Sequence, residues 1–342
     1  MLISNTNRRV LLSIVTWNHA GTIKNTIDSI FKQTYKDLKV VIFDNKSEDE
    51  TIDVIKRSEF IDHITLIQNE SNIGFCGGHN EIIKNNKFDY IFLVNPDIIL
   101  KEDYIEKALK AFNIDKKIGA VCGLLLQSFD ENPKIDSTGM SLMKSRRFEL
   151  INHGLKLGDI ELSSGYVAGL DGALPAFKAE AVQDLLINGD LFNQLFFAHK
   201  EDWDISWRLI LFGWKIYFYK ESIAMHPRMF KPNNLRRRIF INNKIKFNAF
   251  KNQLLLLLIN EDKVNFIKDS YIILFRLFVT TIFCILFEPK SLKAYNYVLQ
   301  NWKKIFSFRK QVQKRRKVSN NCFRIFLNWK GIKEKAIECL YY

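Results

Sequence analysis

Short apolar runs alternate with helical stretches over residues 10–130, and this alternation constrains the fold more than any other feature of the chain. Each apolar run has the length and the β-branched or aromatic content of a buried strand. The expected strands are residues 10–16, 38–43, 64–67 and 90–94, and the expected helices are residues 22–33, 51–56 and 77–86. Strands that alternate with helices predict a mostly parallel sheet covered on both faces. We therefore expect an α/β fold.

The length and the cysteines narrow the class of protein. With 342 residues, 47% of them hydrophobic, the chain can form one large α/β domain and an appendage. Its five cysteines are odd in number and include no C-x-x-C pair, which predicts a reducing compartment rather than a disulfide framework or a zinc site. No long apolar segment follows the first charged residues, so we expect no signal peptide.

Charge is distributed unevenly along the chain. Residues 231–342 contain 24 lysines and arginines against 6 acidic residues, whereas residues 1–230 are slightly acidic. Such a basic segment predicts a polyanionic partner, either a membrane surface or a nucleic acid. Residues 271–287 are nearly apolar but shorter than the roughly 20 residues of a spanning helix. Because aromatic residues accompany the basic run at 309–317, we expect residues 231–342 to form a helical, amphipathic region that associates with anionic membranes. An ordinary helical lid with a solvated basic face is the alternative.

Asn95-Pro96-Asp97 directly follows the fourth expected strand. The proline ends the strand because it has no N–H to donate. In open α/β sheets ligands bind beyond the carboxyl ends of the strands. Asp97 is therefore a candidate ligand for Mg²⁺ or Mn²⁺ and for the phosphate groups that such an ion carries. A turn in which Asp97 caps a helix starting near Lys101 explains the pattern equally well.

Two further segments follow strands. Asp44 ends the second strand and could accept the imide N–H of a uracil or thymine ring on which Trp17 stacks, although Ser47 or Asp49 could simply cap the next helix. Residues 72–80 are rich in glycine and precede a helix, where backbone N–H groups can approach a phosphate. A simple turn is the alternative for this segment.

A second block of candidate residues lies at 200–226. Asp202, on an expected helix over residues 200–212, is a candidate general base, because a sugar hydroxyl is a poor nucleophile until its proton is accepted. Asp204 and Arg208 are four residues apart, so a surface ion pair worth about 0.3–0.5 kcal/mol is the alternative use of this acidic cluster. His226 follows a strand-like segment and could join Asp97 on Mn²⁺, although a lone histidine is more often structural.

Taken together, these segments resemble the family 2 glycosyltransferases, and most closely their bacterial rhamnosyltransferase-like and galactofuranosyltransferase-like branch. The matching stretches occur in family order: residues 13–18, 41–47, 72–80, 92–97, 171–178, 197–208 and His226. Asn95 stands where the family's D-x-D motif has its first acid, and Lys178 stands where arginine is common. Beyond residue 230 the chain matches only in its basic and amphipathic character.

The resemblance implies a GT-A fold over residues 1–230, with a nucleotide-sugar-binding half at 10–130 and an acceptor-binding half at 131–230. It also implies inverting transfer from TDP-rhamnose or a UDP-sugar to a saccharide or lipid-linked saccharide, with Mg²⁺ or Mn²⁺ on Asp97 and His226 and with Asp202 as base. The implied donor-binding residues are Thr16, Trp17, Asn18, Asp44, Asn72, Gly74, Asn80, Asn95 and Asp97. The implied acceptor-side residues are Gly172, Glu201, Trp203, Asp204 and Arg208.

Such enzymes commonly extend lipid-linked saccharides in cell-surface polysaccharide synthesis, which implies a cytoplasmic protein on the inner face of the plasma membrane. Other functions fit the residues less well. A nucleotidyltransferase needs a basic glycine-rich loop after the first strand, and residues 17–21 contain no lysine or arginine. No RNA- or DNA-binding signature accompanies the basic segment, so we expect no nucleic-acid partner. A degenerate, inactive relative is disfavoured by the presence of Asp44, Asp97 and Asp202.

Overall fold

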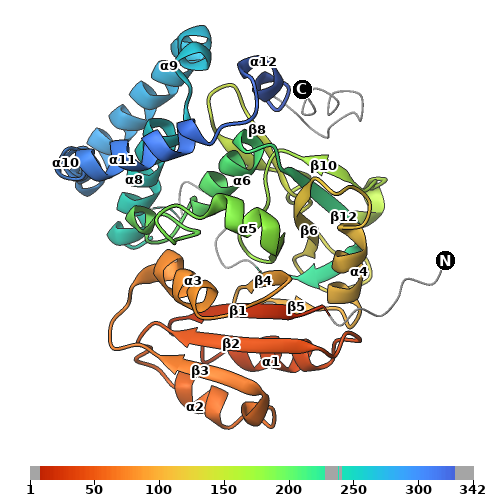
Figure 1. The fold of residues 1–342 in the computed structure, drawn as a ribbon. Coiled ribbons are helices and arrows are strands. Elements are labelled where there is room, and N and C mark those ends of the chain that lie inside the picture. The colour runs from red at the N-terminus through yellow and green to blue at the C-terminus, as the bar shows by residue number, and fades with distance from the viewer. Residues whose placement is uncertain (1–7, 228–237, 239–240, 328–342) are drawn as a thin grey trace.

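A computed structural model describes residues 8–227, 238 and 241–327. Its main sheet has the strand order β10-β12-β6-β11-β4-β1-β2-β3, with β5 paired to β12 and β7 paired to β6 (Figure 1). The strands are β1 (Val10–Thr16), β2 (Leu38–Asp44), β3 (Ile64–Gln68), β4 (Tyr90–Val94), β5 (Ile99–Leu100), β6 (Ile118–Leu126), β7 (Ile135–Ser137), β10 (Gly165–Val167), β11 (Pro175–Lys178) and β12 (Lys215–Met225). A separate hairpin pairs β8 (Met140–Leu142) with β9 (Phe148–Leu150).

The sheet is mostly parallel, as expected. Strands β3, β2, β1 and β4 are parallel neighbours, and β6 is parallel to β12. Strand β11 runs antiparallel to both β4 and β6, so these two strands are parallel to each other. All seven residues of β1 and all five of β4 are buried, which explains why they read as continuous apolar runs rather than alternating ones.

Helices cover the sheet and form a C-terminal bundle (Figure 1). Those of the first two-thirds are α1 (Ile23–Phe31), α2 (Thr51–Lys56), α3 (Gly74–Lys84), α4 (Tyr104–Ala111), α5 (Ala179–Leu185) and α6 (Glu201–Leu211). The bundle consists of α8 (Asn243–Asn260), α9 (Lys263–Phe287), α10 (Lys293–Gln300), α11 (Trp302–Lys314) and α12 (Asn320–Arg324). Single 3-10 turns lie at Ile61–His63, Leu157–Asp159, Gln194–Phe196 and Pro289–Leu292.

The C-terminal helices share the hydrophobic core of the sheet domain. One cluster of buried residues includes Phe196 and Trp207 together with Leu255 of α8 and Phe323 of α12. The rings of Trp207 and Phe323 stack with centroids 5.7 Å apart. Residues 231–342 were expected to be an appended helical region, and their described part is helical but packs as an integral layer of the molecule.

Helix α9 is longer than the apolar run of residues 271–287 predicted. Its first turns contain the charged residues Lys268 and Asp269, which lie outside that apolar run. With 25 residues, α9 is the one helix in the described ranges that is long and apolar enough to cross a membrane, and only 11% of its most apolar stretch is buried. The other predicted boundaries shift by a few residues. The two strand-like segments before His226 form the single strand β12, with a register shift between Tyr219 and Ile223.

Candidate active site

The candidate residues gather where the parallel strands end. Asp97 lies between β4 and β5, and His226 follows β12. Strand β5 pairs with the end of β12, Ile99 opposite Met225, which carries Asp97 toward His226. As a result, Asp97 Oδ2 lies 3.6 Å from His226 Nε2. Asp97 does not cap the next helix, because α4 begins at Tyr104 and its N-cap residue is Asp103.

Asp136 of β7 orients this histidine. His226 Nδ1 lies 2.8 Å from Asp136 Oδ2, and the Asp136 side chain is fully buried. When Nδ1–H donates to the carboxylate, Nε2 presents its lone pair toward Asp97. Histidine ligands of metals are commonly held in this way by a carboxylate. The sequence analysis missed Asp136, because only the pairing of β7 with β6 brings it beside His226.

The Asp97–His226 pair fits a divalent metal ion only as part of a larger ligand set. An oxygen and a nitrogen ligand 3.6 Å apart can contact one Mn²⁺ or Mg²⁺ ion. Across the described parts of the chain, however, no group of three or more His, Cys, Asp or Glu side chains could hold a metal. The remaining ligands would therefore come from a phosphate-bearing substrate or from water. Asn95 lies at the same turn, where its N–H donates to the Ala173 carbonyl.

Asp44 and Trp17 lie at the ends of β2 and β1. The buried Asp44 carboxylate accepts hydrogen bonds from Ser47 N (2.9 Å) and Ser47 Oγ (2.5 Å). Asn18 N–H donates to Ser47 Oγ, and Asn18 Oδ1 accepts from Glu48 N, so the two strand-end loops are fastened together. Thr16, the last residue of β1, is buried beside this turn. The Trp17 side chain is 50% exposed and free of a stacking partner within the described residues, as a platform for a planar ring requires.

The glycine-rich segment mainly packs the loop that precedes α6. Asn72 Oδ1 accepts from Gly74 N, which has a positive φ of 80°. A side chain at Gly74 would lie 2.5 Å from the Phe197 carbonyl, and Cys76 N–H donates to that same carbonyl. The N–H groups of Gly74 and Cys76 at the start of α3 therefore donate to other protein atoms and are not free to bind a phosphate.

Asn80 differs from its expected role as a donor contact. It is fully buried, and its amide both donates to and accepts from the backbone of Phe192. Neighbouring His79 is also fully buried, beside Ser13 Oγ at 2.7 Å, and burial lowers its pKa to about 3. Both side chains therefore hold α3 against its surroundings, and the pattern of residues 72–80 did not distinguish this packing role from ligand binding.

Asp202 stands in the first turn of α6, close to Gly172. Its carboxylate accepts from Gly172 N (3.3 Å) and from Trp203 N (2.9 Å). A Cβ at position 172 would lie 3.2 Å from the Asp202 Cβ, so glycine allows this close approach. Trp203 packs on Phe148 of β9, with ring centroids 5.5 Å apart. These contacts keep Asp202 at the surface end of α6, as a general base requires.

Glu201, next to Asp202, has a different environment. It is buried, and its Oε2 atom has no hydrogen-bond partner within the described residues. Burial, reinforced by the nearby Asp202 charge, raises the pKa of Glu201 to about 8. The two adjacent carboxyl groups therefore differ in environment: burial favours the protonated form of Glu201, while Asp202 accepts hydrogen bonds from two backbone amides.

Asp204 and Arg208 were expected on the acceptor side, with an exposed ion pair as the alternative. The structure corrects both expectations: their side chains are at most 1% exposed and form a salt bridge of 2.7 Å. Arg208 also donates to the carbonyls of Leu185 and Leu191, and Asp204 accepts from Asn260 of α8. This pair fixes α6 within the core and contacts no open surface.

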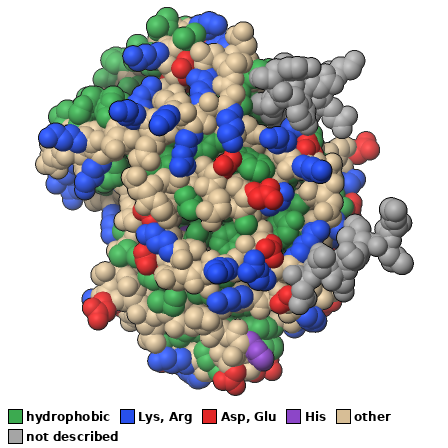
Figure 2. Space-filling view, in the orientation of Figure 1, with side chains coloured by type: hydrophobic (Ala, Val, Ile, Leu, Met, Phe, Trp, Pro, Cys, Tyr) green, Lys and Arg blue, Asp and Glu red, His purple; other side chains and the backbone are tan. Residues whose placement is uncertain are grey.

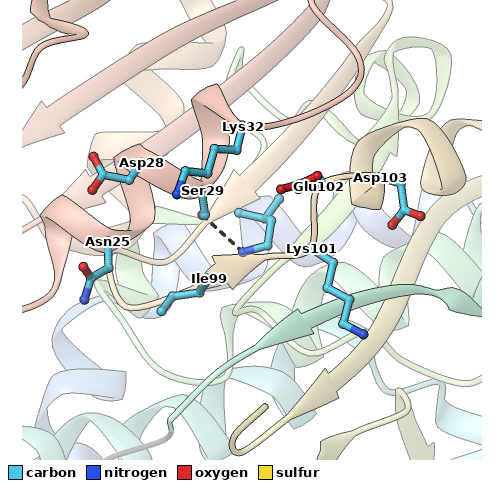
Figure 3. A pocket seen from close by; sticks show the side chains of 9 residues that line it. Asn25, Asp28, Ser29, Lys32, Ile99, Lys101, Glu102 and Asp103 are labelled. Atoms are coloured by element: carbon cyan, nitrogen blue, oxygen red, sulfur yellow. Dashed lines mark hydrogen bonds between the residues drawn. The ribbon is translucent and has the colours of Figure 1, made fainter.

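An open groove between α1 and the β5–α4 turn lies outside this constellation (Figure 3). Ser29 accepts the Leu100 N–H at its centre, and none of the candidate residues lines it.

A family model described as "Glycosyltransferase like family 2" matches residues 7–240, more than two-thirds of the chain. The chain belongs to glycosyltransferase-like family 2. Poly-beta-1,6-N-acetyl-D-glucosamine synthases of Staphylococcus aureus and Staphylococcus epidermidis are 26% and 24% identical over 216 and 215 residues, which is 62% of this chain and 48% of theirs. The chain thus spans about half the length of these relatives.

Solved structures show the same fold at low identity. The mannosyltransferase PcManGT from Pyrobaculum calidifontis, in complex with GDP-Man and Mn²⁺, superposes with a TM-score of 0.52 at 15% identity over 90% of this chain and 86% of its own. GalNAc-T7, with UDP, GalNAc and Mn²⁺, gives a TM-score of 0.55 at 14% identity over 75% of this chain and 48% of its own. The GT-A fold expected from the sequence is confirmed. The rhamnosyltransferase-like branch stays a prediction.

Proposed function

We propose that this family 2 member is an inverting glycosyltransferase that uses a nucleotide-diphosphate sugar, either TDP-rhamnose or a UDP-sugar. One observation carries the proposal: Asp97 and the Asp136-oriented His226 lie together at the strand ends, on the same edge of the sheet as Asp44. Asp44 would receive the base and Trp17 would stack on it. Asp97 and His226 would hold Mg²⁺ or Mn²⁺, which as a Lewis acid stabilises the charge of the departing diphosphate.

In the proposed transfer, Asp202 acts as the general base. Its carboxylate accepts the proton of an acceptor hydroxyl, and the oxygen forms a bond to the anomeric carbon as the bond from that carbon to the donor phosphate breaks. The nucleoside diphosphate leaves with the electron pair, and one in-line displacement inverts the anomeric configuration. Neutral Glu201 adds no second negative charge beside the reacting oxygen at neutral pH.

The acceptor would be a saccharide or lipid-linked saccharide of a cell-surface polysaccharide, reached from the cytoplasmic face of the membrane. Support comes from α9, where most of the large apolar side chains facing outward are about half exposed or more, among them Ile267, Phe275 and Phe278. Figure 2 shows hydrophobic side chains gathered over the bundle, with lysines and arginines beside them. An apolar face bordered by basic residues suits an anionic membrane surface.

A donor panel tests the proposed function. Each candidate nucleotide sugar is incubated with protein and acceptor in Mg²⁺, in Mn²⁺ and in EDTA, and the released nucleotide is identified. We expect one nucleoside diphosphate to be released in an acceptor-dependent manner and only with a divalent ion. Release of inorganic diphosphate would instead indicate nucleotidyl transfer, and no release with any donor would contradict the proposal.

A further inference from the structure

Two half-buried basic side chains, Lys200 and Arg276, meet at one residue of α8, and Lys200 lies two residues before the proposed base. Lys200 immediately precedes Glu201 and Asp202, and Arg276 comes from the middle of α9. Both donate to the same neutral oxygen, Gln253 Oε1, at 3.0 and 2.9 Å. Two basic side chains therefore share one amide oxygen, and within the described residues neither has a carboxylate in salt-bridge contact.

The surroundings add further positive charge. Burial together with Arg276, Arg238 and Arg147 lowers the pKa of Lys200 well below its usual value, and Asp202 only partly opposes this effect. Arg238 and Arg147 have carboxylate partners of their own, Glu288 and Glu149. Clustered cations repel one another, and an anion that binds between them relieves this repulsion. Since both side chains retain some exposure to solvent, an anion can reach them.

The position of the pair indicates which anion it would receive. On one side Lys200 covers the ring of Trp203, 4.9 Å from its centroid, at the head of α6. On the other side Arg276 lies next to Phe275, which is 67% exposed on the apolar face of α9. Asp97 and His226, the expected site of the donor diphosphate, lie on other elements, at the ends of β4 and β12. An anion at Lys200 and Arg276 would thus lie between the base and the apolar face.

We propose that Lys200 and Arg276 bind the phosphate or diphosphate of a lipid-linked acceptor, whose sugar extends toward Asp202 while its hydrocarbon chain lies along α9. This inference rests on the proposed function and specifies its acceptor as phosphate-bearing. Arg276 Nη1 also donates to the Ser145 carbonyl in the turn between β8 and β9, so its guanidinium is held in place before the acceptor arrives.

Binding is tested without turnover. Titration of the full-length protein with farnesyl diphosphate is compared for wild type, Lys200→Gln, Arg276→Gln and the exposed control Lys116→Gln. We expect saturable binding for wild type and the control, about tenfold weaker binding for the two site variants, and no competition by UDP or TDP. Equal binding by all four proteins, no binding at all, or competition by the nucleotides would overturn the assignment. Arg276→Lys, which keeps the positive charge, should recover part of the affinity for farnesyl diphosphate. If Arg276 had only a structural role, restoring the charge would not restore the affinity.

Transfer assays and vesicles separate the remaining outcomes. With the active donor, the KM for a diphosphate-linked lipid saccharide should rise about tenfold in the site variants, while the KM for the same sugar as an uncharged alkyl glycoside should not change. Equal losses with both acceptors would contradict the proposal. If the two site variants lost binding to phosphatidylglycerol vesicles to the same extent as binding to farnesyl diphosphate, Lys200 and Arg276 would instead be assigned to bulk lipid headgroups. A failure of the proposed function would look different. No acceptor would then support sugar transfer, although the wild-type protein would still bind farnesyl diphosphate.

Discussion

At the scale of single residues, neighbouring carboxyl groups are distinguished by their surroundings. Asp202 receives hydrogen bonds from two backbone amides, whereas Glu201 has a buried oxygen without a partner among the described residues. The unfavourable burial of a charge keeps Glu201 protonated at neutral pH. The assignment of Asp202 as base thus has a structural reason that the Glu-Asp sequence alone does not supply.

Replacing Asp202 by Asn tests this assignment. Asparagine keeps the size and the contact with Gly172, but it does not accept the proton of the acceptor. We expect kcat to fall by about 10²–10⁴-fold, with an unchanged dissociation constant for the nucleoside diphosphate. Single-turnover transfer and nucleotide titration provide the two measurements. Full activity in this variant would exclude Asp202 as the base.

Asp136→Asn tests the carboxylate behind His226. An amide at this position orients the ring less firmly and no longer raises the basicity of Nε2. We expect about 10–100-fold weaker Mn²⁺ binding, measured in the presence of nucleoside diphosphate by the electron paramagnetic resonance of free Mn²⁺. The nucleotide affinity without metal should not change. Unaltered Mn²⁺ affinity would show that Asp136 does not act through the histidine.

Glu201 makes the stability of the fold depend on pH. Its folded pKa of about 8 lies above the unfolded value, so the folded state binds more protons between these two values. Stability should therefore fall as pH rises from about 5 to 8. Glu201→Gln should remove this part of the slope, so that the variant gains thermal stability relative to wild type at pH 8 but not at pH 5. Parallel pH profiles of the melting temperature for both proteins would contradict the expectation.

At the scale of elements, α8 holds the loop that presents the base. Phe197, His199 and Lys200 all have positive φ values, an uncommon conformation for residues other than glycine. Asn252 of α8 donates to the carbonyls of Phe196, Ala198 and His199, and Lys251 donates to that of Leu195. Backbone strain of this kind persists only where its surroundings enforce it. Activity should accordingly depend on the bundle as well as on the sheet domain.

Membrane association should depend on the exposed apolar face of α9. Phe275→Glu together with Phe278→Glu places charge on that face, and each change should weaken binding to phosphatidylglycerol vesicles by about tenfold or more. Flotation of the full-length protein measures the loss, and Ile114→Glu, a change at an exposed isoleucine of the sheet domain, serves as control. Substitutions are preferable to truncation at residue 230, which would expose the shared core. Undiminished flotation of the double variant would leave α9 without this role.

At the scale of the whole molecule, a buried arginine joins the sheet domain to the bundle. Arg146, in the turn between β8 and β9, is fully buried and bonds Glu261 at 2.5 Å and Asp269 at 2.9 Å. Arg324 of α12 also bonds Asp269. Asp269 lies just before the apolar run of residues 271–287, and its ion pairs anchor α9 to the rest of the molecule.

Arg146→Gln should leave the buried Glu261 carboxylate without its arginine and Asp269 with Arg324 alone, and breaking a buried ion pair typically costs about 3–5 kcal/mol. We expect a lower melting temperature and a transition that remains single, because the sheet domain and the bundle share one core. Calorimetry or circular dichroism measures both properties. The exposed neighbour Arg147→Gln is the matched control and should change stability by no more than about 1 kcal/mol. Separate melting of the bundle would contradict a shared core.

Sequence alone determined the alternating strands and helices and marked Asp97, Asp202 and His226 as candidates, because local composition records these features directly. The GT-A fold was implied by the resemblance to family 2. Tertiary structure decided which polar residues are buried in the core and which residues from distant parts of the chain lie together. Asn80 and the Asp204–Arg208 pair read as site residues but are buried, whereas Asp136 and the Lys200–Arg276 pair gave no local signal. The physical reason is that strand pairing and helix packing set these distances between residues far apart in the chain, and no pattern within one segment records them.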